Sequence, residues 1–205
     1  MISHPRLSGR ASPEEQSMKI GVISDTHGYF DPRLRELLKG VEGILHAGDV
    51  DSPDILEELK KIAPVHAVRG NVDGADLNLP LTRTLELAGV QVEMQHILPG
   101  RQAELAEWSH AALQGHPLPK RGQGFLKNFG EATRVVVFGH SHEPCLIALT
   151  QTLFFNPGSA GKRRFSLPRC CGLLEISSKE IKGLMVSLED GEKNLPAAVA
   201  IPVKR

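Results

Sequence analysis

The feature that most constrains the fold is a series of apolar runs, each of which ends in a polar cluster. Residues 20–23, 44–45, 65–68 and 135–138 are the four clearest runs. Buried strands consist of nearly continuous apolar residues, and the carboxyl ends of parallel strands lie along one edge of an open α/β sheet. The sequence therefore predicts strands whose ends bring the polar clusters together.

The polar clusters contain side chains that can ligate metals. Side chains two apart on an extended segment point to the same side, so Asp25 can act with His27, and His140 with His142. Carboxylate, amide and imidazole groups in this number are about what two neighbouring divalent metals need. The candidate metal ligands, in chain order, are Asp25, His27, Asp49, Asn71, His96, His140 and His142.

The ordered motifs resemble those of the calcineurin-like metallophosphoesterase superfamily, in particular its small phosphodiesterase branch. That family carries D-x-H, G-D, G-N, H and G-H-x-H in this order, and the similarity covers about residues 18–178. The resemblance implies an α/β fold, a four-layer αββα sandwich of two mixed β-sheets flanked by helices. It also implies two metal sites that share Asp49, one with Asp25, His27 and His142, the other with Asn71, His96 and His140.

The implied activity is hydrolysis of a small phosphodiester by a hydroxide that bridges the two metals. Two divalent ions outweigh the charges of two carboxylates, so the site would attract a phosphate. We expect manganese, with iron, zinc, nickel or cobalt as alternatives, because imidazole and carboxylate ligands suit all of them. A non-catalytic scaffold subunit with the same fold is the alternative function.

Two departures from the family pattern affect the site. Ile97 follows His96 where the family usually has glycine, so the backbone turn there is expected to differ. Larger superfamily members place a proton-donating histidine after Gly-Asn, whereas Val72 and Asp73 stand here. Asp73 is the candidate catalytic acid if burial raises its pKa, and a turn-stabilising carboxylate is the alternative.

A third departure is the long connection between His96 and His140, in which residues 97–130 are expected to be inserted. Residues 101–114 have a helix-forming composition. This helix is expected either to pack on the domain edge or to act as a lid or dimer contact. A lid could bring His110 or His116 to the site as the missing acid.

The motif Asn-Pro-Gly-Ser at residues 156–159 precedes a basic cluster at residues 162–164. A solvated turn is the simplest interpretation of this segment, because these residue types favour turns. The alternative is that Arg163 or Arg164 binds a substrate phosphate through a bidentate contact.

Composition argues against other partners and locations. Lys plus Arg equals Asp plus Glu at 24 each, and aromatic residues make up 4%, so neither an overall field nor stacking platforms favour nucleic acid. No apolar stretch approaches the roughly 18 residues that span a bilayer. The three cysteines lack C-x-x-C spacing, which suggests a reducing compartment. We expect a cytoplasmic protein without membrane contact, and formation of a homo-oligomer is compatible with the sequence.

The length of 205 residues predicts one domain. We place it at residues 18–187, after a flexible extension of residues 1–17 and before an irregular tail of residues 188–205, with Met18 as an alternative start. Hydrophobic periodicity predicts a βαβαβ series over residues 19–69 and a mostly β second half.

Overall fold

The computed structural model describes residues 17–164, 166–189 and 195–203. Residues 1–16 of the predicted N-terminal extension lie outside these ranges. The described strands form two mixed β-sheets, one with six strands and one with five.

The first sheet has the strand order β11-β10-β9-β1-β2-β3. Strands β1, β2 and β3 are parallel, whereas β9, β10 and β11 pair antiparallel. The parallel strands therefore all end at the same edge of the sheet. The bounds are β1 Met18–Ile23, β2 Gly43–His46, β3 Val65–Ala67, β9 Cys170–Ile176, β10 Glu180–Ser187 and β11 Val199–Pro202.

Strand β11 lies within the C-terminal segment that was expected to be irregular. It pairs with β10 in the register Ile181 to Ile201, and Ile201 is buried in the core. The alternation of exposed and buried residues in this strand matches the two-residue period of a sheet with one buried face. The expectation of irregular structure is wrong for residues 199–202, while the domain boundaries remain a prediction.

The second sheet has the strand order β4-β5-β6-β8-β7. Strands β5, β6 and β8 are parallel to one another, and each outer strand is antiparallel to its neighbour. The bounds are β4 Thr82–Leu87, β5 Val90–Gln95, β6 Thr133–Val137, β7 Cys145–Leu149 and β8 Thr152–Asn156.

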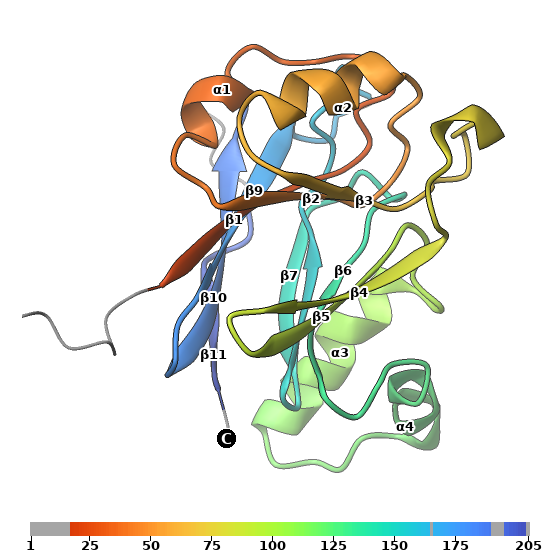
Figure 1. Ribbon diagram of the computed structural model, residues 1–205. Helices are drawn as coiled ribbons and strands as arrows, with labels where there is room; N and C mark the ends of the chain where they lie inside the picture. The colour runs from red at the N-terminus through yellow and green to blue at the C-terminus, as the bar shows by residue number, and fades with distance from the viewer. Residues whose placement is uncertain (1–16, 165, 190–194, 204–205) are drawn as a thin grey trace, which may run out of the picture.

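The helices cover the outer faces of the two stacked sheets, as Figure 1 shows. Helices α1 (Leu34–Leu37) and α2 (Pro53–Lys60) pack on the first sheet through Leu34 and Leu59, whereas α3 (Gln102–Leu113) and α4 (Lys120–Leu126) pack on the second through Trp108 and Phe125. A short 3-10 helix, η2, spans Ala75–Leu77. The predicted four-layer αββα sandwich is confirmed.

The main core lies between the two sheets. Val22 and Leu45 from the first sheet belong to the same buried cluster as Val92, Val137 and Phe155 from the second. All five side chains are fully buried, so the burial of apolar surface holds the two sheets face to face. This packing fixes the ends of β1, β2, β5 and β6 relative to one another.

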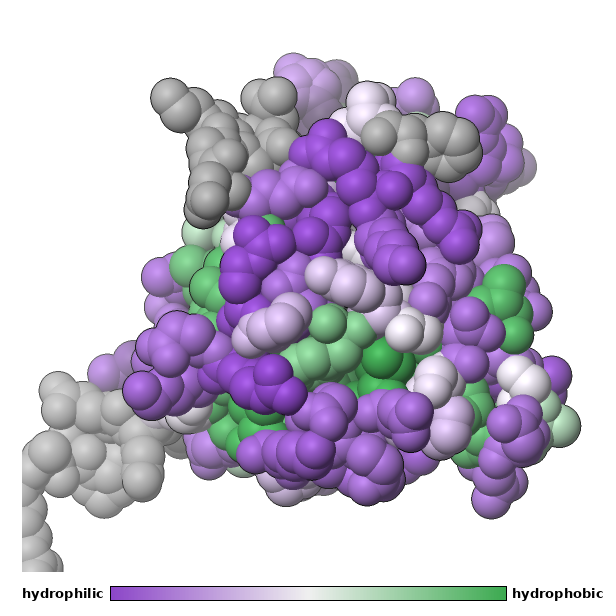
Figure 2. Space-filling model, turned by 90° about the horizontal axis from the view of Figure 1, so that it is seen from above, coloured by the Kyte–Doolittle hydropathy of each residue, from purple (hydrophilic) through white to green (hydrophobic). Residues whose placement is uncertain are grey.

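The outer surface differs from this core. The face that carries α1 and α2 is mostly hydrophilic (Figure 2). In the part of the chain that the structure describes, no helix is both long enough and apolar enough to cross a membrane.

Candidate metal centre

The first group of predicted ligands lies where β1 ends. Nε2 of His142 is 3.3 Å from Oδ1 of Asp25 and 3.1 Å from Nε2 of His27. Nε2 of His27 is in turn 3.8 Å from Oδ2 of Asp49. Residues far apart in the sequence therefore present one carboxylate and two imidazoles to a common point, with Asp49 at its border.

The second group lies on the other side of Asp49. Nε2 of His96 is 3.3 Å from Oδ1 of Asp49 and 3.0 Å from Oδ1 of Asn71. Nδ1 of His140 is 2.8 Å from the same Asn71 oxygen. The two carboxylate oxygens of Asp49 thus face different groups of ligands, which is the arrangement that a bridging carboxylate requires.

Most of these ligands have an unusual backbone conformation. Asp25, His27, Asp49, His140 and His142 have φ values of 54°, 47°, 56°, 71° and 58°. Residues other than glycine seldom adopt the left-handed region, which costs about 1 kcal/mol or more each, and such residues concentrate at functional sites. The extended geometry predicted for the D-x-H and H-x-H pairs is therefore wrong, although Asp25 and His27 do converge.

Glycines of the motifs let the backbone approach the ligands closely. A Cβ at Gly70 would collide with Oδ1 and the backbone nitrogen of Asp49 and would lie 2.8 Å from its Cγ. A Cβ at Gly139 would lie 2.8 Å from Oδ2 of Asp25. Only glycine fits at these positions without displacing a carboxylate.

Burial sets the protonation of the first group. Burial raises the pKa of Asp25 to about 6. Burial and, after it, the nearby His27 together lower the pKa of His142 to about 4. The pKa of His27 is also lowered, chiefly by burial. Neutral imidazoles with free lone pairs are the form that ligates metals.

Two buried atoms of this group have no hydrogen-bond partner among the described residues. They are Nδ1 of His142 and Oδ1 of Asp25, and the latter lies 3.3 Å from Nε2 of His142 without the geometry of a hydrogen bond. An unsatisfied buried carboxylate oxygen is costly unless a cation or a donor meets it. The donor set of carboxylate and imidazole groups fits a divalent cation at this point.

His96 is oriented for ligation by a second contact. Its Nδ1 lies 2.7 Å from the carbonyl oxygen of Ala47, so Nδ1–H donates there and, in the neutral ring, Nε2 presents a lone pair to Asp49 and Asn71. Acceptors that face one another need a cation or a proton between them. Burial lowers the pKa of His96, but the hydrogen bond to Asp49 and the charge of Asp25 raise it above its ordinary value.

Asp49 is held in its charged form. Burial raises its pKa, yet the hydrogen bond with His96 and the one from the backbone N–H of Val72 lower it to about 2 overall. A permanently ionised carboxylate between two ligand groups suits the shared position.

Asp73 does not have the contacts of a catalytic acid. It is buried, its Oδ1 accepts the backbone N–H of Asp51 at 2.7 Å, and its Oδ2 accepts that of Gly70 at 2.7 Å. Both carboxylate oxygens are therefore occupied by backbone donors. These contacts support the alternative of a turn-stabilising carboxylate, and the acid role stays a prediction that they argue against.

The motif at residues 156–159 forms part of the support of the site. Asn156 and Ser159 are buried. Nδ2 of Asn156 donates to the carbonyl oxygen of Gly139 at 3.1 Å, and Oγ of Ser159 donates to that of Asp25 at 2.8 Å. The interpretation of this segment as a solvated turn is wrong, because its polar side chains bind the loops that carry the ligands. In the sequence, the occurrence of this motif together with the ligand motifs was the signal that could have indicated its role in supporting the site.

The predicted inserted helix begins beside the site and leads away from it. Oε1 of Gln102, at the start of α3, accepts hydrogen bonds from Ser141 and Asn156. His110 lies eight residues later, about 12 Å along the helix axis. Leu105 and Trp108 pack α3 on the second sheet. The contacts support a helix packed on the domain edge, and the lid role for residues 97–130 stays a prediction.

The structure distinguishes the two arginines of the basic cluster. Arg163 pairs with the carboxylate of Glu189, with its Nε 3.0 Å from Oε1. Arg164 is exposed, and its charge contributes to the lowered pKa values of His27 and His142. The charge of Arg164 therefore acts on the metal centre.

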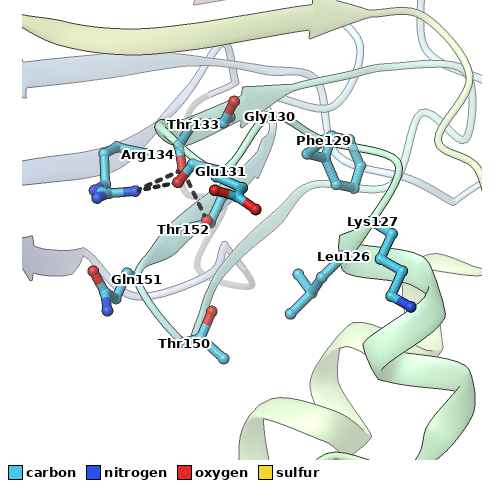
Figure 3. A pocket seen from close by; sticks show the side chains of 10 residues that line it. All are labelled: Leu126, Lys127, Phe129, Gly130, Glu131, Thr133, Arg134, Thr150, Gln151 and Thr152. Carbon is cyan, nitrogen blue, oxygen red and sulfur yellow. Dashed lines mark hydrogen bonds between the residues drawn. The ribbon is translucent and has the colours of Figure 1, made fainter.

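A separate hollow of about 580 Å³ lies at the opposite end of β6, lined by Thr133, Arg134, Thr152 and their neighbours (Figure 3). Nη1 of Arg134 donates to the carbonyl oxygens of Glu131 and Thr133. The predicted ligands do not line this hollow, so it is distinct from the metal centre.

Comparison with known proteins bears on this geometry. The model of the calcineurin-like phosphoesterase superfamily domain matches residues 18–179. The chain belongs to this superfamily. A probable metallophosphoesterase of Methanothermobacter thermautotrophicus is 33% identical over 159 residues, which cover 74% of this chain and 82% of that protein. A phosphodiesterase of Methanocaldococcus jannaschii is 25% identical and matches over 82% of this chain and 99% of its own length.

A solved structure shows the same fold in another protein. Vacuolar protein sorting 29 of Cryptosporidium parvum superposes with a TM-score of 0.66 at 19% identity, covering 92% of this chain and 99% of that chain. At this identity the likeness shows the fold alone.

Proposed function

We propose that this protein is a dinuclear metal-dependent phosphoesterase that hydrolyses a small phosphodiester. The observation that carries the proposal is the position of Asp49, whose two oxygens lie 3.8 Å from His27 and 3.3 Å from His96 in the two ligand groups. Membership of the superfamily and the name of the phosphodiesterase relative support the same activity.

The proposed ligand sets follow the two groups. Asp25, His27 and His142 would hold one divalent cation with Asp49, and Asn71, His96 and His140 the other. When bound, two such cations supply a hydroxide from water near neutral pH and attract the phosphoryl oxygens. We expect manganese to support the highest rate.

The chain's own residues orient the site and control access to it. Asn71 and His140 are exposed, whereas Asp25, Asp49 and His96 are buried, so a substrate reaches the centre from the side of Asn71 and His140. Asp73 holds the loop of Asn71 through its hydrogen bond to the amide of Gly70. Arg164 adds positive charge on the side of His27 and would attract the phosphate.

Departure of the leaving group is the step for which the described residues offer the least help. The carboxylate of Asp73 is already occupied by two backbone amides. We therefore expect esters with good leaving groups, such as nitrophenyl esters, to react much faster than alkyl diesters. Equal rates on matched aryl and alkyl diesters would show that an acid is present.

The direct test is hydrolysis of bis-p-nitrophenyl phosphate by metal-stripped protein that is reconstituted separately with manganese, nickel, cobalt, zinc or magnesium. Turnover is expected only with added metal and is expected to vanish in Asp49→Ala. Turnover that persists in the stripped protein, or in Asp49→Ala, would contradict the proposal.

The second candidate function is a non-catalytic scaffold, which the fold shared with vacuolar protein sorting 29 favours. All seven candidate ligands are present and grouped here, and this weighs against the scaffold function. Two bound metals per chain without turnover on any phosphoester would favour the scaffold.

A further inference from the structure

We propose that the pocket beside Asn71 and His96 binds a bulky apolar substituent of the phosphoester substrate. This inference rests on the proposed function and adds the substrate class. The pocket has a volume of about 450 Å³ and lies between the loop before β4 and the end of β5. Asn71 and His96 line both this pocket and the second ligand group, so a phosphoryl group at the metals would have its substituent beside the pocket.

The apolar part of the lining, Leu81 and Ile97, comes from side chains that the fold leaves uncovered, and the other lining side chains are polar. Among the described residues, the exposed large hydrophobic side chains are Val72, Leu81, Ile97 and Leu113, and the first three lie around this pocket or next to Asn71 in the chain. Leu81 is 69% exposed and Ile97 is 52% exposed. Such residues usually lie scattered on a surface, whereas a group of them beside a reactive centre is typical of a ligand site.

Ile97 has a sequence signal of its own. It stands directly after His96, where the superfamily usually has glycine, and it forms part of the pocket wall. A glycine there would leave the wall without a side chain. The replacement therefore adds apolar surface on the accessible side of the centre, next to His96, which would hold the second cation.

Size and charge favour a small organic ester over a larger partner. The volume is in the range of pockets that take small molecules and far exceeds a methyl group. Arg69 lines the same pocket, and its Nε donates to the carbonyl oxygen of Asp73 at 3.2 Å, which holds its charge at the wall. A positive charge beside an apolar wall suits an anionic phosphoryl group that carries an apolar substituent.

The experiment measures binding of methylphosphonate and phenylphosphonate to the metal-loaded protein by calorimetry. Each probe has one substituent, so the result does not depend on which ester bond would be cleaved. Phenylphosphonate is expected to bind at least about tenfold more tightly, since burial of a few carbon atoms against Leu81 and Ile97 gives discrimination of this size. In Leu81→Ser and in Ile97→Ser the ratio of the two affinities should fall towards one.

Leu113→Ser is the matched control, because Leu113 is 85% exposed and lies at the far end of α3. It should keep the wild-type ratio. Equal affinities for both phosphonates in the wild type would overturn the inference and leave the proposed function intact. Failure of both probes to bind protein that holds two metals would instead count against the proposed function.

A second copy of the chain is another occupant that the test separates. A dimer that dissociates in Leu81→Ser, together with equal binding of the two phosphonates, would assign the apolar surface to self-association and overturn the inference.

Discussion

Replacement of Gly70 by alanine tests the link between the glycine motifs and the metal centre. The new Cβ would lie 2.8 Å from Cγ of Asp49. Carbon atoms in contact are normally about 3.5 Å apart or more, so this contact alone requires the carboxylate to move by about 0.7 Å, and the closer contacts with Oδ1 and the backbone nitrogen of Asp49 require more. Metal sites tolerate deviations of about 0.2 Å in ligand distances. The bridging position would therefore be lost or strongly weakened.

We expect Gly70→Ala to lower metal affinity by about 10- to 100-fold or more, the range found when groups that orient ligands are changed. Overpacking should also lower the free energy of unfolding by about 1–3 kcal/mol. Metal titration of stripped protein, followed by metal analysis after dialysis, measures the first effect. Chemical denaturation of the metal-free protein measures the second and shows whether the variant is folded.

Gly124→Ala is the matched control, since a Cβ at this exposed position in α4 would meet nothing within 4 Å. Alanine there should leave metal affinity unchanged and stabilise the helix by up to about 1 kcal/mol. A folded Gly70→Ala protein that binds two metals with wild-type affinity would refute the reasoning.

Three further predictions concern single side chains. Arg164→Gln should raise KM for bis-p-nitrophenyl phosphate several-fold, because it removes a charge that acts on His27 and His142. Arg163→Gln should leave KM unchanged, because Arg163 pairs with Glu189. Equal KM values in the two variants would contradict this distinction. Asp73→Asn should weaken binding of metal, through the loop of Asn71, and leave the shape of the pH–rate profile unchanged; loss of one limb of the profile would restore Asp73 as the acid. Asp31 is buried between Arg33 and Arg169, and the hydrogen bond from Arg33 holds its pKa well below its usual range. Because this folded-state pKa lies below the unfolded value of about 3.9, the stability that ionised Asp31 contributes is present above that value and is lost as the pH falls further. Asp31→Asn should therefore lower the free energy of unfolding by about 2–3 kcal/mol at pH 7. In urea titrations, the difference in free energy of unfolding between the wild type and this variant should shrink below about pH 4. A difference that is constant with pH would contradict this assignment.

The succession of strands along the chain and the convergence of the ligands could be predicted because both depend on patterns that are local in sequence. The apolar runs before Asp25 and Asp49 became β1 and β2, and their parallel pairing brought the following residues together. The resemblance to the superfamily supplied the division of the ligands into two groups, which spacing alone did not indicate. His140 and His142, two residues apart, lie in different groups.

The remaining features depend on tertiary contacts. The left-handed conformation of Asp25 is held partly by the hydrogen bond from its backbone N–H to the carbonyl oxygen of Gly48. No local sequence pattern predicts this contact. Burial of Asn156 follows from its bonds to the loop of Gly139. Strand β11 forms because Ile201 completes the core beside β10, although the segment before it is rich in turn-forming residues. In each case a distant partner overrode the local preference.

The central claim is that Asp49 is shared by two metals. The most direct measurement is anomalous diffraction at the manganese edge from crystals grown with manganese. We expect two peaks about 3.5–4 Å apart, with one oxygen of Asp49 directed at each. A single peak, or two peaks that Asp49 does not join, would contradict it.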